Sequence, residues 1–106
     1  MKLYRYTSSG EGVFSIGKRL LPQNLVEEAN KARAWLPKPT LLEGDYTFYL
    51  SEKGKEQYEA TLLKVRQKYL KDIKCDETAL EDLLKENRIV FQDEWQIVTT
   101  KKNHLS

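Results

Sequence analysis

An apolar stripe recurs at helical spacing in the second half of the chain, and it constrains the fold more than any other feature. The stripe has four members: Tyr58, Leu62, Val65 and Tyr69. Residues three and four apart share one face of a helix, so this spacing predicts a long amphipathic helix over about 52–71, despite Gly54 in its first turn. Ser51 directly precedes the helix and is a preferred N-cap residue. A helix with one apolar face needs a partner layer, which we expect to be a sheet.

Strand-like stretches lie on both sides of this helix. Residues 46–50 read Tyr-Thr-Phe-Tyr-Leu after a Glu-Gly-Asp turn signal, which is typical of a strand. Residues 3–7 alternate in the same way and predict a first strand. Residues 88–91 and 95–100 flank the polar residues 92–94, and this arrangement predicts a closing β-hairpin.

Proline and capping residues predict two further helices. The first covers about 23–35 and stops there because Pro37 pushes the preceding residue out of the helical region. Asp76 is expected to cap a third, short helix that ends near Asn87. Residues 8–17 are expected to form a loop whose apolar side chains contact the core.

The predicted order is therefore β-α-β-α-α-β-β. It favours an α+β fold in which a small, mostly antiparallel sheet of about four strands is packed by two long helices and one short helix. At 106 residues the chain fits one domain, and we assign residues 1–100 to it. Residues 101–106 are predicted to be a flexible tail.

Composition narrows the class of protein. The longest apolar runs are far shorter than the roughly 20 residues that cross a bilayer, and no secretory signal follows the start, so we expect no membrane partner. Cys75 is the single cysteine, which excludes an internal disulfide and favours the cytoplasm.

The net charge of +2 gives little attraction to nucleic acid. Lys64, Lys68 and Lys71 lie one turn apart on the long helix, so a nucleic-acid groove remains open beside the more ordinary interpretation as a solvated face.

Catalytic groups are scarce. The single histidine, His104, falls in the predicted tail, and Cys75 has no histidine near it in sequence. A zinc site of nitrogen and sulfur ligands cannot form from one histidine and one cysteine, although an all-carboxylate site stays open. We therefore expect no metal and no cofactor, and binding rather than catalysis. Residues 12–19 come within one residue of the phosphate-binding pattern G-x-x-x-x-G-K-[ST], but Arg19 replaces its hydroxyl residue, so we interpret them as an ordinary loop.

Tyrosine is the unusual component of the sequence, which contains six tyrosines and two tryptophans. Such side chains are rigid, with an apolar body and a polar tip, and they dominate protein contact sites. Together with nearby basic and hydroxyl residues they give the candidate binding set Tyr4, Arg5, Tyr6, Ser8, Lys18, Arg19, Tyr49, Ser51 and Trp95. We interpret the chain as a small interaction or regulatory protein, of the kind that phages and mobile elements encode, that binds another macromolecule, with a protein as the expected partner.

Two segments also carry a family resemblance: residues 3–8, Leu-Tyr-Arg-Tyr-Thr-Ser, and residues 48–51, Phe-Tyr-Leu-Ser, running into a helix. They resemble the ADP-ribosyltransferase-like fold. The resemblance implies an NAD site faced by Arg5 and lined by Tyr49 and Ser51, with Glu94 as the candidate catalytic residue. The sequence departs from the family in lacking its Ser-Thr-Ser motif and its acidic pair. An NAD-dependent enzyme, or an inactive relative, is therefore the alternative function.

Overall fold

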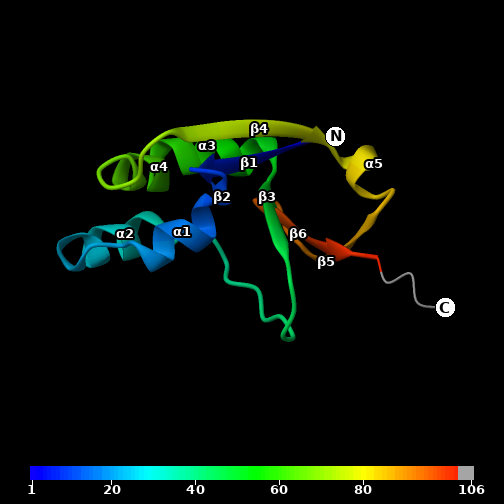
Figure 1. The fold of residues 1–106 in the computed structure, drawn as a ribbon, viewed down its shortest axis with the longest axis horizontal. Helices are drawn as coiled ribbons and strands as arrows, with labels where there is room; N and C mark the ends of the chain where they lie inside the picture. Colours follow the sequence, from blue (N-terminus) through cyan, green and yellow to red (C-terminus); the bar gives the residue numbers. More distant parts are fainter. Residues whose placement is uncertain (103–106) are drawn as a thin grey trace.

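Strand β1 organises the sheet in the computed structural model of the chain, which describes residues 1–102 (Figure 1). Every strand pair in this part of the chain is antiparallel. In chain order the elements are β1 (Lys2–Ser8), β2 (Glu11–Gly12), α1 (Val13–Arg19), a 3-10 turn (Gln23–Leu25), α2 (Val26–Ala32), β3 (Thr47–Leu50), α3 (Glu52–Ala60), α4 (Leu62–Arg66), β4 (Ile73–Ala79), α5 (Leu80–Leu83), β5 (Asn87–Gln92) and β6 (Gln96–Lys101).

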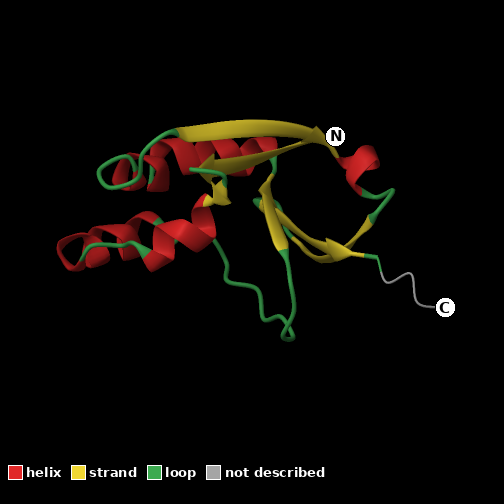
Figure 2. Cartoon of the chain, in the orientation of Figure 1, coloured by secondary structure: helices red, strands yellow, loops and turns green. Residues whose placement is uncertain are grey.

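The two edges of β1 are used differently. Along one edge β4 pairs with it over its whole length, from Lys2 opposite Ala79 to Ser8 opposite Ile73. On the other side β3 is joined to β1 through Tyr4 opposite Leu50, and β2 pairs only with the far end of β1. β3 continues the sheet through β6 to β5. Beyond the short β1–β3 contact the strands separate, and the sheet divides into two halves (Figure 2).

Helices cover the β1 half of the sheet. Figure 1 shows α3 and α4 lying along β1 and β4, with α1 and α2 forming a second arm beside them. Strand alternation directs Tyr4 and Tyr6 toward α3, where Lys55 lies over the Tyr4 ring and Glu59 accepts the Tyr6 hydrogen bond. The core between these layers is an apolar cluster: Tyr6, Val13, Ile16, Leu50, Tyr58, Leu62 and Leu70. None of the helices in residues 1–102 is long or apolar enough to cross a bilayer.

The α+β class and the antiparallel pairing agree with the sequence, but the predicted sheet of about four strands packed by two long helices and one short helix is wrong. Residues 1–102 form six strands and five α-helices. The strands expected at 3–7 and 46–50 and the closing hairpin are confirmed within one or two residues. β6 extends to Lys101, and residues 103–106 of the predicted tail, including His104, lie outside the described residues.

The long helix predicted over 52–71 is divided at Thr61. The Thr61 hydroxyl donates to the carbonyl oxygen of Gln57 at 2.7 Å and accepts from Nε1 of Trp35 at 2.9 Å. Such a hydroxyl bond to the carbonyl four residues earlier bends a helix. The Thr61 backbone leaves the helical region (φ −128°, ψ −86°), so α3 ends at Ala60 and α4 begins at Leu62. Similarly, the first predicted helix is a 3-10 turn followed by the short α2.

The helix that Asp76 was expected to cap is also wrong, because Asp76 lies in the middle of β4, opposite Arg5. Capping preference is local and small, whereas seven paired positions with β1 satisfy the backbone over the whole segment. Only residues 80–83 are helical there. Residues 8–17 are likewise not one loop: they contain β2 and most of α1, in which Val13 and Ile16 are buried three residues apart.

Candidate functional site

Three of the predicted binding residues have structural roles. The Tyr6 side chain is buried, and its hydroxyl donates to Oε2 of Glu59 at 2.7 Å. Burial and this hydrogen bond raise the pKa of Tyr6, which therefore stays un-ionised. The Ser8 hydroxyl is buried and donates to the carbonyl oxygen of Lys71. Ser51 caps α3 by accepting from the Gly54 N–H at 3.0 Å.

Others are engaged with neighbours at the surface. Nη1 of Arg19 lies 2.8 Å from Oε2 of Glu11. The ring of Trp95 packs edge-on against that of Trp35, with centroids 5.3 Å apart. Tyr4 lies beneath the Lys55 ammonium, 5.3 Å from the ring centroid. The predicted set therefore does not form one surface.

Glu94 lies beside α3. Its Oε2 accepts from Nζ of Lys53 at 2.8 Å, and its backbone carbonyl accepts from the Ser51 hydroxyl at 2.6 Å. Arg5, by contrast, lines a hollow of about 240 Å³ at the point where β1 and β3 separate. Glu94 is not among the residues that line it. Burial raises the pKa of Tyr49, and the positive charge of Arg5 opposes that increase.

The Arg5 hollow shares lining residues with a second hollow, and this second hollow shares lining residues with a third; Phe14 lines all three. The next hollow has a volume of about 500 Å³ and shares Phe14, Ser15, Tyr46 and Phe48 with it. A third hollow of about 220 Å³ shares Phe14, Lys18, Arg33 and Lys38 with the second. We call the walls of this run the aromatic–basic groove, and define it by six residues: Phe14, Tyr46, Phe48, Lys18, Arg33 and Lys38.

Local sequence explains how the aromatic wall forms. Phe14 lies at the start of α1 and packs against Phe48 of β3, with ring centroids 6.2 Å apart, and against Tyr58 of α3 at 5.8 Å. Lys18 follows Phe14 by one helical turn, so both side chains lie on the same face of α1. An aromatic residue and a cation therefore meet at the same side of the groove.

The opposite wall is the connection between α2 and β3, and hydrogen bonds hold it at three points. Nε2 of Gln96 donates to the carbonyl oxygen of Pro37 at 2.7 Å. The Tyr46 hydroxyl donates to the carbonyl oxygen of Leu42 at 2.6 Å, and the Thr100 hydroxyl to that of Asp45 at 2.9 Å. These contacts fix the segment that carries Lys38 and Tyr46 into the groove.

The three groove cations are among the lysine and arginine side chains that form no ion pair with a carboxylate in the described part of the chain. Within residues 1–102, seven lysine and arginine side chains form ion pairs with carboxylates: Lys2, Arg19, Lys31, Lys53, Lys55, Lys68 and Lys85. Lys18, Arg33 and Lys38 form none within that part of the chain. Two acids line the three hollows: Asp45 in the 500 Å³ hollow and Glu11 in the 240 Å³ hollow. Five cations line the same hollows (Arg5, Lys18, Arg33, Lys38 and Arg66), so the groove carries an excess of positive charge.

Arg66 lies in the wall of the smallest hollow, and sequence reasoning missed it. Its side chain is 5% exposed, Nη1 donates to the Tyr58 hydroxyl at 3.0 Å, and the guanidinium carbon lies 4.8 Å from the centroid of Phe14. A Cβ atom at Gly17 would lie 2.8 Å from Nε of Arg66, so glycine leaves room for the guanidinium. The missed signal was its spacing: Arg66 follows Leu62 by four residues and so lies on the apolar face of the helix.

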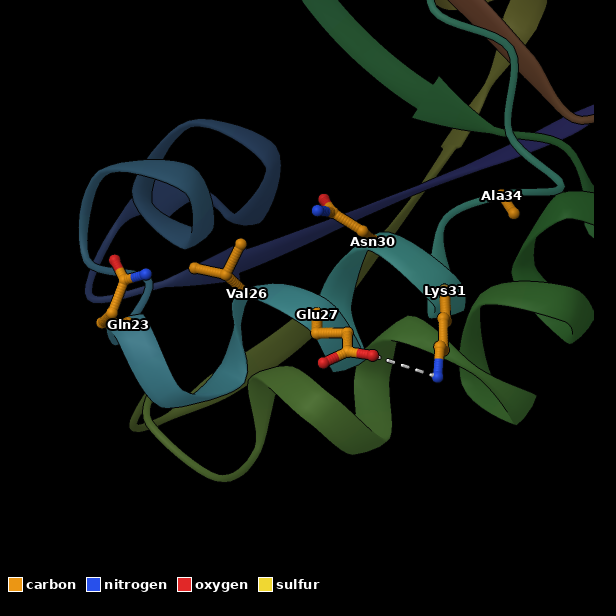
Figure 3. Close-up of a pocket in the computed structure, with 6 residues that line it drawn as sticks. All are labelled: Gln23, Val26, Glu27, Asn30, Lys31 and Ala34. Carbon is orange, nitrogen blue, oxygen red and sulfur yellow. Dashed lines mark ion pairs between the residues drawn. The ribbon is translucent and has the colours of Figure 1, made fainter.

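A further hollow, of about 580 Å³, lies elsewhere (Figure 3). A single stretch of chain, from Gln23 to Ala34, supplies all of its lining residues. Figure 3 shows the ion pair of this face, between Glu27 and Lys31, with oxygen and nitrogen 3.4 Å apart. Binding sites need polar groups that converge from different elements, so we do not assign a function to this hollow.

No cluster of three potential metal ligands occurs in residues 1–102. Comparisons with models of protein families, with curated proteins and with solved structures found no match to this chain.

Proposed function

We propose that this protein is a small binding protein that holds an acidic segment of a partner protein in the aromatic–basic groove. The observation that supports this most is the set of three cations, Lys18, Arg33 and Lys38, which line one hollow and form no ion pair within residues 1–102. Unpaired positive charge beside a partner's carboxylates favours association and fixes its register.

The aromatic side chains supply the second requirement of a protein contact site. Phe14, Phe48 and Tyr46 provide apolar surface, and such surface contributes to affinity when it is removed from water. Because the three hollows form a run rather than a single pit, an extended segment can place successive side chains in successive hollows. Acidic side chains beside Lys18 and Lys38 and an apolar one beside Phe48 would match this pattern.

We place this binding in the cytoplasm, because the sequence has one cysteine.

Selection from a random peptide library tests the proposal. The wild-type protein is the target, and the triple variant Lys18→Glu, Arg33→Glu, Lys38→Glu is the counter-target. The expected result is enrichment of peptides that combine Asp or Glu with an aromatic or aliphatic residue, and loss of their binding to the triple variant.

A matched control is the triple variant Lys64→Glu, Lys71→Glu, Lys74→Glu, which changes the net charge equally at exposed positions outside the groove. It should bind the selected peptides as the wild type does. Equal binding to both triple variants, or enriched peptides without acidic residues, would contradict the proposal. A labelled single-stranded oligonucleotide that binds the wild type and not the groove variant would instead indicate nucleic acid.

NAD is a second candidate ligand, favoured by the position of Arg5. Its side chain lines the hollow where β1 and β3 separate, and its positive charge opposes the raised pKa of Tyr49. The family resemblance assigns both of these residues, together with Ser51, to an NAD site. NAD carries two phosphates and two flat rings, which suit cations and aromatic walls. The corresponding function is that of an NAD-dependent ADP-ribosyltransferase-like enzyme or an inactive relative.

A thermal-shift titration distinguishes this candidate. A ligand that binds only the native state raises Tm by mass action, so millimolar NAD should raise the Tm of the wild type and leave that of Arg5→Ala unchanged. An unchanged wild-type Tm removes NAD from consideration. Equal shifts in the wild type and in Arg5→Ala would exclude the Arg5 hollow as its site.

A further inference from the structure

Arg66 is the most deeply buried cation of the groove region. Within residues 1–102 its guanidinium forms no ion pair, and its side-chain hydrogen bond is the one from Nη1 to the Tyr58 hydroxyl. A guanidinium has five N–H donors. The rings of Phe14 and Tyr58, 4.8 and 5.5 Å from its central carbon, supply attraction to its faces but accept none of these protons in conventional hydrogen bonds.

Burial of a guanidinium without a counter-charge is unfavourable, because the protein interior solvates an ion less well than water does. An anion in the adjacent hollow relieves this cost. Arg66 lines the hollow of about 220 Å³ together with Lys18, Arg33 and Lys38, and no acidic residue lines it. Four cations from α1, α4 and the segments around α2 therefore converge on one small space.

The size and charge of this hollow indicate which anion it takes. Its volume is below the roughly 300 Å³ at which pockets for whole drug-sized ligands begin, so it suits one functional group. Guanidinium groups bind phosphate oxygens through two parallel hydrogen bonds, and lysines add point charges. Two arginines and two lysines suit a dianion better than a single carboxylate.

From these observations we infer that the Arg66 hollow is a binding site for a phosphate group. The inference rests on the proposed function, because Lys18, Arg33 and Lys38 belong to both sites, and it deepens that function by naming the group at the inner end of the groove. The phosphate group belongs either to a phosphorylated side chain of the bound segment or to a small phosphate compound.

The first arm of the test uses inorganic phosphate against chloride at equal ionic strength, with Tm as the measurement. Phosphate should raise the Tm of the wild type but not that of Arg66→Met, a substitution that replaces the buried charge with an apolar side chain of similar length. The double variant Arg33→Met, Lys38→Met alters residues nearer the surface and should also lose the shift. The double variant Lys64→Met, Lys71→Met, which removes two exposed charges elsewhere, should keep it.

The second arm uses one acidic peptide from the selection in two versions, with serine or with phosphoserine at its centre. Fluorescence anisotropy measures the affinity of the protein for each version. Binding of the phosphopeptide at least roughly tenfold tighter, with the difference abolished in Arg66→Met, identifies a phosphorylated side chain as the ligand. Equal peptide affinities together with the Tm shift in phosphate identify a small phosphate compound.

Failure of the inference and failure of the proposed function give different results. If acidic peptides bind while neither phosphate nor phosphoserine has any effect, the phosphate site is wrong and the peptide groove stands. If phosphate raises Tm and no acidic peptide binds, the site stands and the peptide groove is wrong. If the Tm shift in phosphate persists in both the Arg66→Met and the Arg33→Met, Lys38→Met variants, phosphate binds elsewhere and the inference is overturned.

Discussion

Gly54 in α3 packs directly against the backbone of Trp95, so a Cβ atom at position 54 would overlap the Trp95 carbonyl oxygen. That oxygen also accepts from the Ser51 N–H at 3.0 Å. The start of α3 is thereby fixed against the β5–β6 hairpin, and this contact holds the two halves of the sheet together.

We expect Gly54→Ala to destabilise the protein, although alanine is normally the better helix residue by about 1 kcal/mol. The collision is with backbone, which cannot move aside as a flexible side chain can, so the loss should be about 2 kcal/mol or more. Urea unfolding measures it. Glu56→Ala, at an exposed position of the same helix, should stay within about 0.5 kcal/mol of the wild type. A stabilised Gly54→Ala protein would show that this contact is absent.

The Ser51 hydroxyl links the same two elements, since it accepts from the Gly54 N–H and donates to the Glu94 carbonyl. Ser51→Ala removes both bonds and should cost about 1–2 kcal/mol in the free energy of unfolding. Ser51→Thr keeps the hydroxyl and should lose less. If the alanine variant unfolds at the same urea concentration as the wild type, the hydroxyl contributes nothing at this position.

Tyr58 and Arg66 form a buried pair, and the two members depend on each other. Tyr58→Phe removes the hydroxyl that accepts from Nη1 and leaves that donor without its partner, so we expect a loss of about 1–3 kcal/mol. Replacing both residues, as Tyr58→Phe with Arg66→Met, should recover part of this loss because no buried charge remains. A double-mutant cycle measured by urea unfolding checks both expectations. Additive losses would mean that the two side chains are not coupled.

The Tyr6–Glu59 hydrogen bond should make stability depend on pH. This bond is the largest cause that lowers the pKa of Glu59 below its usual 4.5. Partial burial raises that pKa, and the hydrogen bond and the charge of Lys55 lower it further. The folded state therefore favours the carboxylate. The resulting stabilisation is present above the unfolded pKa near 4.5 and is lost as the pH falls through the lower folded pKa.

Tyr6→Phe should raise the pKa of Glu59. NMR titration of the Glu59 side-chain carboxyl measures this change. The difference in free energy of unfolding between wild type and variant should narrow as the pH falls below about 4.5. The pH-dependent part of this difference should be small, because Glu59 is partly exposed and solvent screens its charge. The control is Tyr69→Phe, which removes a hydrogen bond to the carbonyl oxygen of Gly17 and involves no carboxylate. Its stability loss should not change with pH. An unshifted Glu59 titration in Tyr6→Phe would contradict the assignment.

Sequence alone determined the elements whose signals are local. The alternating run at 46–50 became β3, a hairpin formed around the polar residues 92–94 with its turn at 93–95, and Ser51 caps α3 as expected. Each of these depends on backbone preference and hydrogen bonds within a few residues of chain, which composition and spacing report directly.

Tertiary structure decided the elements for which a distant partner outweighs local preference. Asp76 has a capping side chain, but β1 offers a complete ladder to its segment, so a strand forms there. Thr61 ends α3 through hydrogen bonds to Gln57 and to the distant Trp35. The sequence around Asp76 gives no sign of its pairing with β1, and the sequence around Thr61 gives no sign of its contact with Trp35.

The candidate site belongs to the second group. Arg5 and Lys18 were predicted to bind a partner, but nothing along the chain connects Phe14 with Tyr46, or Arg66 with Lys38. Their proximity follows from the packing of α1, α4, β3 and the connection between α2 and β3 around the groove. Periodicity specifies which face of an element a side chain occupies, whereas only the packing of whole elements brings two faces into one space.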